Sequence, residues 1–108
     1  MKVIVTLLIL LFSLPVVCQY YDVSSYEKIA EGLAGFEDPI DFEDWFGYSV
    51  ESIGDLNNDG INEFAIAALK DDDGGLNRGA IYIIFPRVDG TIDRYQKISS
   101  SKGGFTGV

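Results

Sequence analysis

Residues 26–30 read YEKIA, and 69 positions later residues 95–99 read YQKIS. The pair Gly35-Phe36 recurs at the same offset as Gly104-Phe105. Two matches at one fixed offset indicate an internal repeat, and repeats on this scale are typical of solenoids, propellers and arrays. The sequence between the two copies therefore defines one structural unit.

Four strand-like runs lie inside this unit, at residues 47–53, 63–69, 79–85 and 91–98, and turn residues separate them. Asp89-Gly90, between the third and fourth runs, is the dipeptide of a two-residue type I′ hairpin. No helical period lasts for three turns. We therefore predict an all-β fold with a four-stranded antiparallel sheet.

The second and third runs are apolar on both faces instead of alternating, which indicates strands covered on both sides. In a β-propeller each four-stranded blade packs between two neighbours, which accounts for such strands. A β-sandwich with a strongly apolar inner sheet is the alternative, and the internal repeat favours the propeller. We therefore predict that the unit is one propeller blade.

The loop at residues 54–63 (GDLNNDGINE) carries the strongest chemical signal in the chain. Its oxygen-bearing side chains recur at alternate positions, and Gly60 permits a sharp turn between them. Oxygens at this spacing converge on one centre, and calcium takes six to eight such ligands. The predicted ligands are Asp55, Asn57, Asp59, the carbonyl of Ile61, and Glu63.

Other interpretations of this loop fit less well. An EF-hand needs an acidic residue at position 12 and a helix on each side, whereas position 12 here is Ile66 inside a strand pattern. Magnesium demands a more regular octahedron, and soft metals need Cys or His. A polar turn without metal is the remaining alternative, and the donor spacing favours calcium.

The order of these features resembles one FG-GAP repeat, the unit of integrin α-subunit-like β-propellers. The resemblance rests on FGYSV at 46–50, GDLNNDG at 54–60, EFAIAA at 63–68, RGAIY at 78–82 and DGT at 89–91. It implies a propeller with calcium-binding loops on an exported protein. Two positions depart from the repeat: residues 67–69 (AAL) replace the usual Gly-Ala-Pro, and Glu63 replaces the usual Asp.

The N-terminus predicts an exported protein. Lys2 precedes an apolar run at residues 3–14, and the chain turns polar after Cys18, which is the pattern of a signal peptide at 1–18. The run is shorter than the about 20 residues of a membrane span, so we expect no transmembrane span. Acylation of Cys18 in a lipoprotein is the alternative. The part after Cys18 has no cysteine and hence no disulfide framework.

Composition excludes several classes of function. The 108-residue chain has a net charge of −9, which becomes −10 when Lys2 is removed with the signal peptide. It has no basic cluster, so nucleic acid and anionic membrane surfaces are poor partners. It also has no His, which removes His-based catalysis and His metal ligands.

Three further clusters have both a functional and a structural interpretation. Residues 71–73 (DDD) are a second cation site or, as we expect, a solvated loop. Trp45, Phe46 and Tyr48 are a ligand platform or, as we expect, a contact between blades. The carboxylates at residues 37–44 include pairs that suit glycoside hydrolysis, but acidic loops are too common here to decide the point.

The expected organisation is a signal peptide at 1–18, a lead-in with an outer-edge strand at 19–45, one FG-GAP repeat at 46–98, and the start of a second repeat at 99–108. Residues 25–30 resemble the fourth run, and we expect them to pair with residues beyond this chain. Further blades are expected in the same chain, so the propeller is incomplete here. The unit alone should associate or order poorly.

The expected function is that of a secreted or cell-surface calcium-binding module, non-catalytic in this part, which recognises an extracellular protein or glycan. Two alternatives stay open: an accessory propeller of an extracellular hydrolase, and a structural surface-layer protein. In each case calcium would hold the loop that a disulfide holds in other exported proteins.

Overall fold

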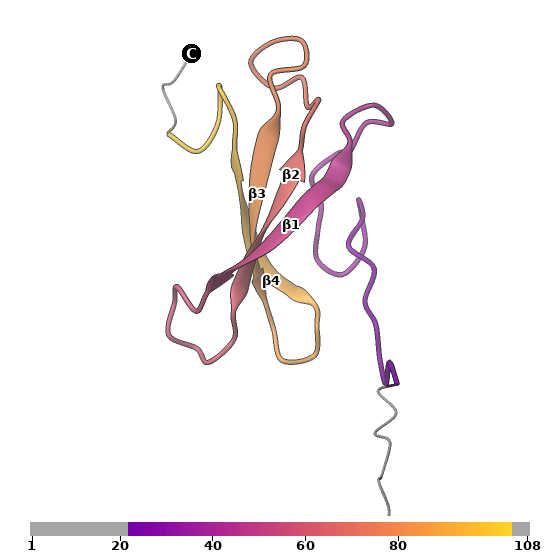
Figure 1. Cartoon of the computed structure of the whole chain (residues 1–108), viewed down its shortest axis with the longest axis vertical. Helices are drawn as coiled ribbons and strands as arrows, with labels where there is room; N and C mark the ends of the chain where they lie inside the picture. The colour runs from indigo at the N-terminus through magenta and orange to yellow at the C-terminus, as the bar shows by residue number, and fades with distance from the viewer. Residues whose placement is uncertain (1–21, 105–108) are drawn as a thin grey trace, which may run out of the picture.

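The structure is a computed structural model that describes residues 22–104. In this part of the chain four strands form one antiparallel sheet, and there is no helix. The strands are β1 (Phe46–Gly54), β2 (Glu63–Ala68), β3 (Ala80–Pro86) and β4 (Ile92–Ile98), in the order β1-β2-β3-β4 (Figure 1). The predicted all-β fold and four-stranded antiparallel sheet are confirmed. The predicted signal peptide at 1–18 lies outside the described residues.

Each strand of the twisted sheet pairs with the next one along the chain (Figure 1). The β1–β2 loop and the β3–β4 turn lie at one end of the sheet, and the β2–β3 loop lies at the other (Figure 1). β2 and β3 pair without irregularity, whereas the pairings of the edge strands β1 and β4 contain register shifts. No helix among the described residues has the length and apolar character that crossing a membrane requires.

The turn between β3 and β4 differs from the predicted two-residue type I′ hairpin. The N–H of Arg87 donates to the Thr91 carbonyl at 2.7 Å, and the N–H of Gly90 donates to the Arg87 carbonyl at 3.0 Å. Within this turn only Gly90 has a positive φ, 88°, whereas type I′ requires two such residues. The loop is therefore a three-residue type I turn that ends in a left-handed glycine. Asp89 favours it, because its Oδ1 accepts the N–H of Thr91 at 2.9 Å.

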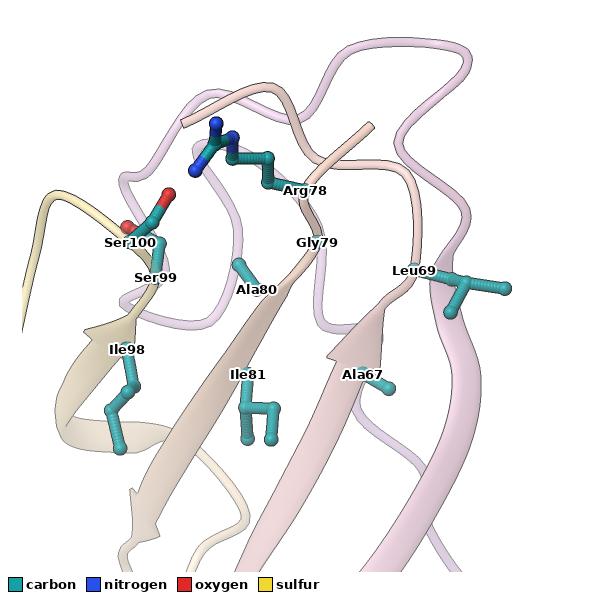
Figure 2. Close-up of a pocket in the computed structure, with 9 residues that line it drawn as sticks. All are labelled: Ala67, Leu69, Arg78, Gly79, Ala80, Ile81, Ile98, Ser99 and Ser100. Carbon is teal, nitrogen blue, oxygen red and sulfur yellow. The ribbon is translucent and has the colours of Figure 1, made fainter. Parts of the chain in front are cut away.

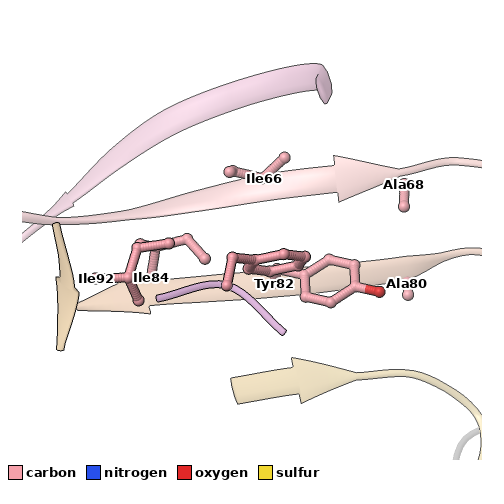
Figure 3. Close-up of a cluster of buried hydrophobic side chains, with 7 residues drawn as sticks. Ile66, Ala68, Ala80, Tyr82, Ile84 and Ile92 are labelled. Atoms are coloured by element: carbon pink, nitrogen blue, oxygen red, sulfur yellow. The ribbon is translucent and has the colours of Figure 1, made fainter. Parts of the chain in front are cut away.

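The two faces of the sheet are covered unequally. One of them, the covered face, carries Ile66, Tyr82 and Ile84, which are all buried (Figure 3). The lead-in segment 29–45 packs on this face through Phe36, which is 0% exposed and whose ring centroid lies 5.3 Å from that of Tyr82 and 4.7 Å from that of Tyr95. The core of the unit thus lies between its own lead-in and one face of its sheet.

The opposite face, the open face, is not covered by any described segment. Ala65 and Ala67 of β2 and Ile81 and Ile83 of β3 point to it, since they alternate with the buried residues. Ile81 is 46% exposed. Within the described residues, the prediction that these strands are covered on both sides is therefore met on one face only.

Residues 25–30, predicted to form an outer-edge strand, are assigned to no strand, and Tyr26 is 87% exposed. They do not pair with β4, the strand whose sequence they repeat. Their pairing with residues beyond this chain stays a prediction.

Candidate metal centre

The β1–β2 loop is folded by hydrogen bonds from its own backbone to its acidic side chains. The carboxylate of Asp55 accepts the N–H of Asp59 at 3.1 Å and the N–H of Gly60 at 2.8 Å. Asp59 in turn accepts the N–H of Ile61 at 2.8 Å. Asn58 and Gly60 have φ of 59° and 84°, a conformation that Asn and Gly adopt more readily than other residues. The loop therefore closes tightly on its carboxylates.

Three carboxylates meet in this loop. Asp55, Asp59 and Glu63 each offer one oxygen, and these oxygens all lie within 4.8 Å of one another. Two oxygens on opposite sides of one calcium ion, each bound at about 2.3–2.6 Å, are separated by at most about 5 Å. The spacing of this acidic triad therefore fits a single cation of that size.

Glu63 gives the strongest indication that the β1–β2 loop can hold a cation. It is the first residue of β2, where it pairs with Gly54 of β1, and it is 0% exposed. Its Oε2 accepts the N–H of Leu56, while its Oε1 has no hydrogen-bond partner among the described residues. A buried carboxylate oxygen without a partner costs free energy that a bound cation would offset. The donors are all oxygens, which hard cations prefer.

The other two predicted ligands lie in the same loop. Asn57 contacts Asp59 twice, since its Oδ1 accepts the N–H of Asp59 at 3.2 Å and its Nδ2 donates to the carboxylate of Asp59 at 3.2 Å. Ile61 contributes its N–H to the loop, and the role of its carbonyl oxygen stays a prediction. The structure thus brings three predicted ligands together and attaches the fourth, Asn57, to Asp59.

A second carboxylate cluster, which the sequence analysis missed, lies at the other end of the sheet. Its centre is Lys97 on β4, whose side chain is 9% exposed and whose Nζ lies 2.7 Å from Asp71, 2.9 Å from Asp73 and 3.5 Å from Asp38. The hydroxyl of Tyr82 donates to Asp38 at 2.9 Å and to Asp71 at 3.4 Å. We call these residues the Lys97 cluster. It joins the lead-in, the β2–β3 loop, β3 and β4.

The interpretation of residues 71–73 as a solvated loop is therefore wrong for Asp71, which is 2% exposed, and for Asp73, whereas Asp72 is exposed. The hydrogen bond from Lys97 lowers the pKa of Asp73. Burial alone would lower the pKa of Lys97, but its bonds to Asp71 and Asp73 outweigh burial and raise that pKa above the usual 10.5. The only sequence signal for this role is that Lys97 belongs to the repeated motif.

The three residues of the predicted aromatic contact lie in two different places. Phe46 packs in the core, with its ring 5.3 Å from both Phe36 and Tyr82, so its contacts lie within the unit and not between blades. Trp45 and Tyr48 instead stack on each other at the surface, 5.9 Å apart, and the Nζ of Lys70 lies 3.8 Å from the Trp45 ring centroid. Phe46 therefore packs in a core, but in the core of its own unit, and a contact of these three residues between blades stays a prediction.

Two of the carboxylates at residues 37–44 have partners within the fold. Asp38 belongs to the Lys97 cluster, while Asp44 is buried and accepts the N–H of Asp41 at 3.0 Å. Burial raises the pKa of Asp44.

Comparison of the chain with models of known protein families finds no match, and comparison with solved structures finds none either.

Proposed function

We propose that this chain is a calcium-binding repeat unit of an exported FG-GAP-type β-propeller protein, with a non-catalytic role in adhesion or recognition of an extracellular protein or glycan. The observation that carries the proposal is the buried carboxylate of Glu63, with one oxygen unpartnered beside Asp55 and Asp59. A calcium ion in this position supplies the missing partner.

The position of the triad explains what the metal does for the fold. Asp55 directly follows β1 and Glu63 opens β2, so one ion ties together the ends of two paired strands. The part of the chain after Cys18 has no cysteine with which to make such a link covalently. Because the ion binds the ordered loop and not the unfolded chain, its binding free energy stabilises the fold. The site is structural and not catalytic.

The repeat-unit part of the proposal rests on different observations. The sheet is a four-stranded antiparallel meander, and the motif on β4 also occurs 69 residues earlier, within the lead-in. One face of this sheet stays open and apolar, as expected of a unit that stands beside another unit. Recognition of a protein or glycan follows from the resemblance to FG-GAP repeats alone.

Isothermal titration calorimetry with calcium chloride tests the metal site on a folded protein of several units that includes residues 19–108. We expect the variant Asp55→Ala plus Asp59→Ala to bind one calcium fewer per chain than the wild type. The matched control, Asp22→Ala plus Glu51→Ala, removes the same charge from exposed positions and should bind as the wild type does. Equal heats from the wild type and the Asp55/Asp59 variant would exclude this site.

A further inference from the structure

Two exposed aromatic side chains lie together at the start of β1, and we call them the aromatic platform. The rings of Trp45 and Tyr48 are stacked, with centroids 5.9 Å apart and an angle of 21° between their planes. Trp45 is 47% exposed and Tyr48 is 64% exposed, whereas Phe46 between them packs against the core. Single apolar residues are common on a protein surface, but a stacked pair of large rings is a continuous apolar surface that a ligand can cover.

The backbone at the platform is held in a conformation that costs free energy. Trp45 has a φ of 55°, in the left-handed region that Gly and Asn adopt more readily than an aromatic residue. The N–H of Tyr48 donates to the Trp45 carbonyl at 3.1 Å, and Gly47 inside this turn has a φ of 86°. The turn coincides with the register shift between Phe46 and Ser49, and such irregularities re-aim side chains. Strained residues of this kind cluster at functional sites, so the stability of the turn does not explain why Trp45 is there.

A lysine lies over the platform. The N–H of Lys70 donates to the Asp44 carbonyl at 3.0 Å, and its Nζ lies 3.8 Å from the centroid of the Trp45 ring. Lys70 forms no ion pair in the described part of the chain. Arg78, the other cation of the β2–β3 loop, projects instead toward Ser100 at the rim of an apolar groove on the open face (Figure 2). Lys70 therefore has N–H donors to offer to a ligand on the platform.

The charges around the platform exclude several classes of ligand. Asp41 and Glu43, both exposed, lie in the turn just before Trp45, and the chain has a net charge of −9, so anionic ligands are repelled. A cationic ligand would meet the ammonium of Lys70 on the Trp45 ring. The centre of a protein interface is depleted of charged residues, whereas this platform carries one directly on it. These observations favour an uncharged ligand that is polar at its edges and apolar on one face.

A neutral sugar has this chemistry. One face of a pyranose ring carries C–H groups, which pack on the electron-rich face of an aromatic ring. Its hydroxyls both donate and accept hydrogen bonds, so an ammonium and carboxylates suit them equally. Aromatic surface with a few polar groups around it is the usual composition of a site for a small ligand.

We propose that the aromatic platform binds an uncharged sugar residue of an extracellular glycan, with the pyranose ring against Trp45 and Tyr48 and with Lys70 donating to a hydroxyl. The inference rests on the recognition role in the proposed function and names its ligand class. It does not depend on the calcium site, which follows the end of β1, whereas the platform lies at its start. Contact of the platform with a neighbouring blade is the competing role.

Isothermal titration calorimetry on the folded protein of several units tests the sugar site. The neutral probes are oligosaccharides of glucose, mannose and N-acetylglucosamine, and the anionic probe is oligogalacturonate. We expect a neutral probe to bind and Tyr48→Ser to remove one binding site per chain. Tyr26→Ser, which removes a ring that is 87% exposed elsewhere, is the matched control and should bind as the wild type does. No heat from any neutral probe, unchanged binding in Tyr48→Ser, or tighter binding of oligogalacturonate would overturn the sugar site.

Trp45→Asn distinguishes a ligand platform from a structural contact. Asn adopts the φ of this position more readily than Trp does, so the variant should unfold at the same or a higher urea concentration while losing the sugar site. Tyr48→Ser should also unfold as the wild type does, because its side chain is exposed. Circular dichroism follows unfolding in both variants. A loss of stability in either variant would assign the platform to a contact between blades and overturn the proposal.

The sugar site and the calcium site fail separately. A protein that binds calcium but none of the neutral probes overturns the sugar site and leaves the metal site intact. A protein that binds a neutral probe at the platform but binds no calcium overturns the metal site and leaves the sugar site intact.

Discussion

Two clusters of carboxylates lie at opposite ends of the same sheet, and only one of them contains its own counter-charge. At the Lys97 cluster three carboxylates surround a buried ammonium, with contacts between 2.7 and 3.5 Å. At the acidic triad three carboxylates meet within 4.8 Å, and one oxygen of Glu63 is buried without a partner. One end of the sheet therefore contains its own cation, and the other is where we propose that an ion from solution binds.

The difference also separates two ways of holding loops in a chain without disulfides. The Lys97 cluster ties the lead-in and the β2–β3 loop to β4 through one side chain, in every solution that keeps the lysine charged. On the proposed function, the triad ties β1 to β2 only when a cation is bound, so the free calcium concentration would set its contribution.

Lys97→Met should cause the largest loss, because it leaves the buried Asp71 without its cation and takes from Asp73 the nearer of its two lysines, so that only Lys102 remains. Breaking a buried ion pair by removing one partner costs about 3–5 kcal/mol. Lys28→Met is the matched control, since Lys28 is the exposed counterpart of Lys97 in the repeat and should change stability by less than about 0.5 kcal/mol. Urea unfolding at low protein concentration, followed by Trp45 fluorescence, measures both. Equal free energies of unfolding in the two variants would show that the Lys97 cluster does not stabilise the fold.

The gain in the free energy of unfolding on calcium binding should be the next largest effect. At about 100 times its Kd, a ligand that binds only the folded chain adds about 2.7 kcal/mol to the free energy of unfolding, and EDTA should remove this gain. The gain should persist in the Lys97→Met chain, because the two clusters share no residue and lie at opposite ends of the sheet. Loss of the calcium effect in the Lys97→Met chain would mean that the ion binds at the Lys97 cluster and not at the acidic triad.

A fall in pH should distinguish the contributions of the two clusters to stability, with a smaller change in the free energy of unfolding. The lowered pKa of Asp73 means that its contribution to stability is present above its ordinary pKa of 3.8 and is lost as the pH falls below that value. Calcium binding requires ionised carboxylates and should already weaken as the pH approaches about 4. At that pH we expect the calcium effect on unfolding to be nearly gone while the difference between wild type and Lys97→Met persists. Simultaneous loss of both would argue against separate clusters.

At alkaline pH only the Lys97 cluster should respond. The pKa of Lys97 is raised, so its contribution is full below the ordinary 10.5 and is lost as the pH rises beyond it. Burial also raises the pKa of Tyr82 above the ordinary 10.0, which adds to the loss in the same direction. Unfolding curves between pH 9 and 12 should therefore converge for wild type and Lys97→Met. Parallel curves over this range would contradict the assignment.

The sequence predicted the sheet well because the signals for it are local. Turn residues bound each strand, and the β2–β3 pairing joins runs such as residues 63–69 and 79–85 that are close in the sequence. The same locality explains the triad, whose members lie within nine consecutive residues, from Asp55 to Glu63. The hairpin type was missed because Asp-Gly serves both turn types, and the hydrogen bonds of Asp89 with Thr91 favour the longer one.

The sequence could not predict what depends on distant partners. Asp71 belongs to an exposed-looking acidic run, and only the packing of β4 against β3 brings Lys97 beside it. Phe36 covers a sheet whose strands begin ten residues later, so its role becomes visible only in three dimensions. Charge runs predict solvation on average, and a single buried lysine is enough to reverse that outcome.

The most direct test of the calcium proposal is the effect of calcium on the unfolding free energy of Glu63→Gln. This variant keeps the shape of the side chain and an oxygen for the N–H of Leu56 but removes the charge; Glu51→Gln, on the exposed side of β1, is the control. We expect Glu63→Gln without calcium to be at least as stable as the wild type and to gain nothing when calcium is added, while the control gains as the wild type does. An equal gain from calcium in Glu63→Gln and in the wild type would contradict the account.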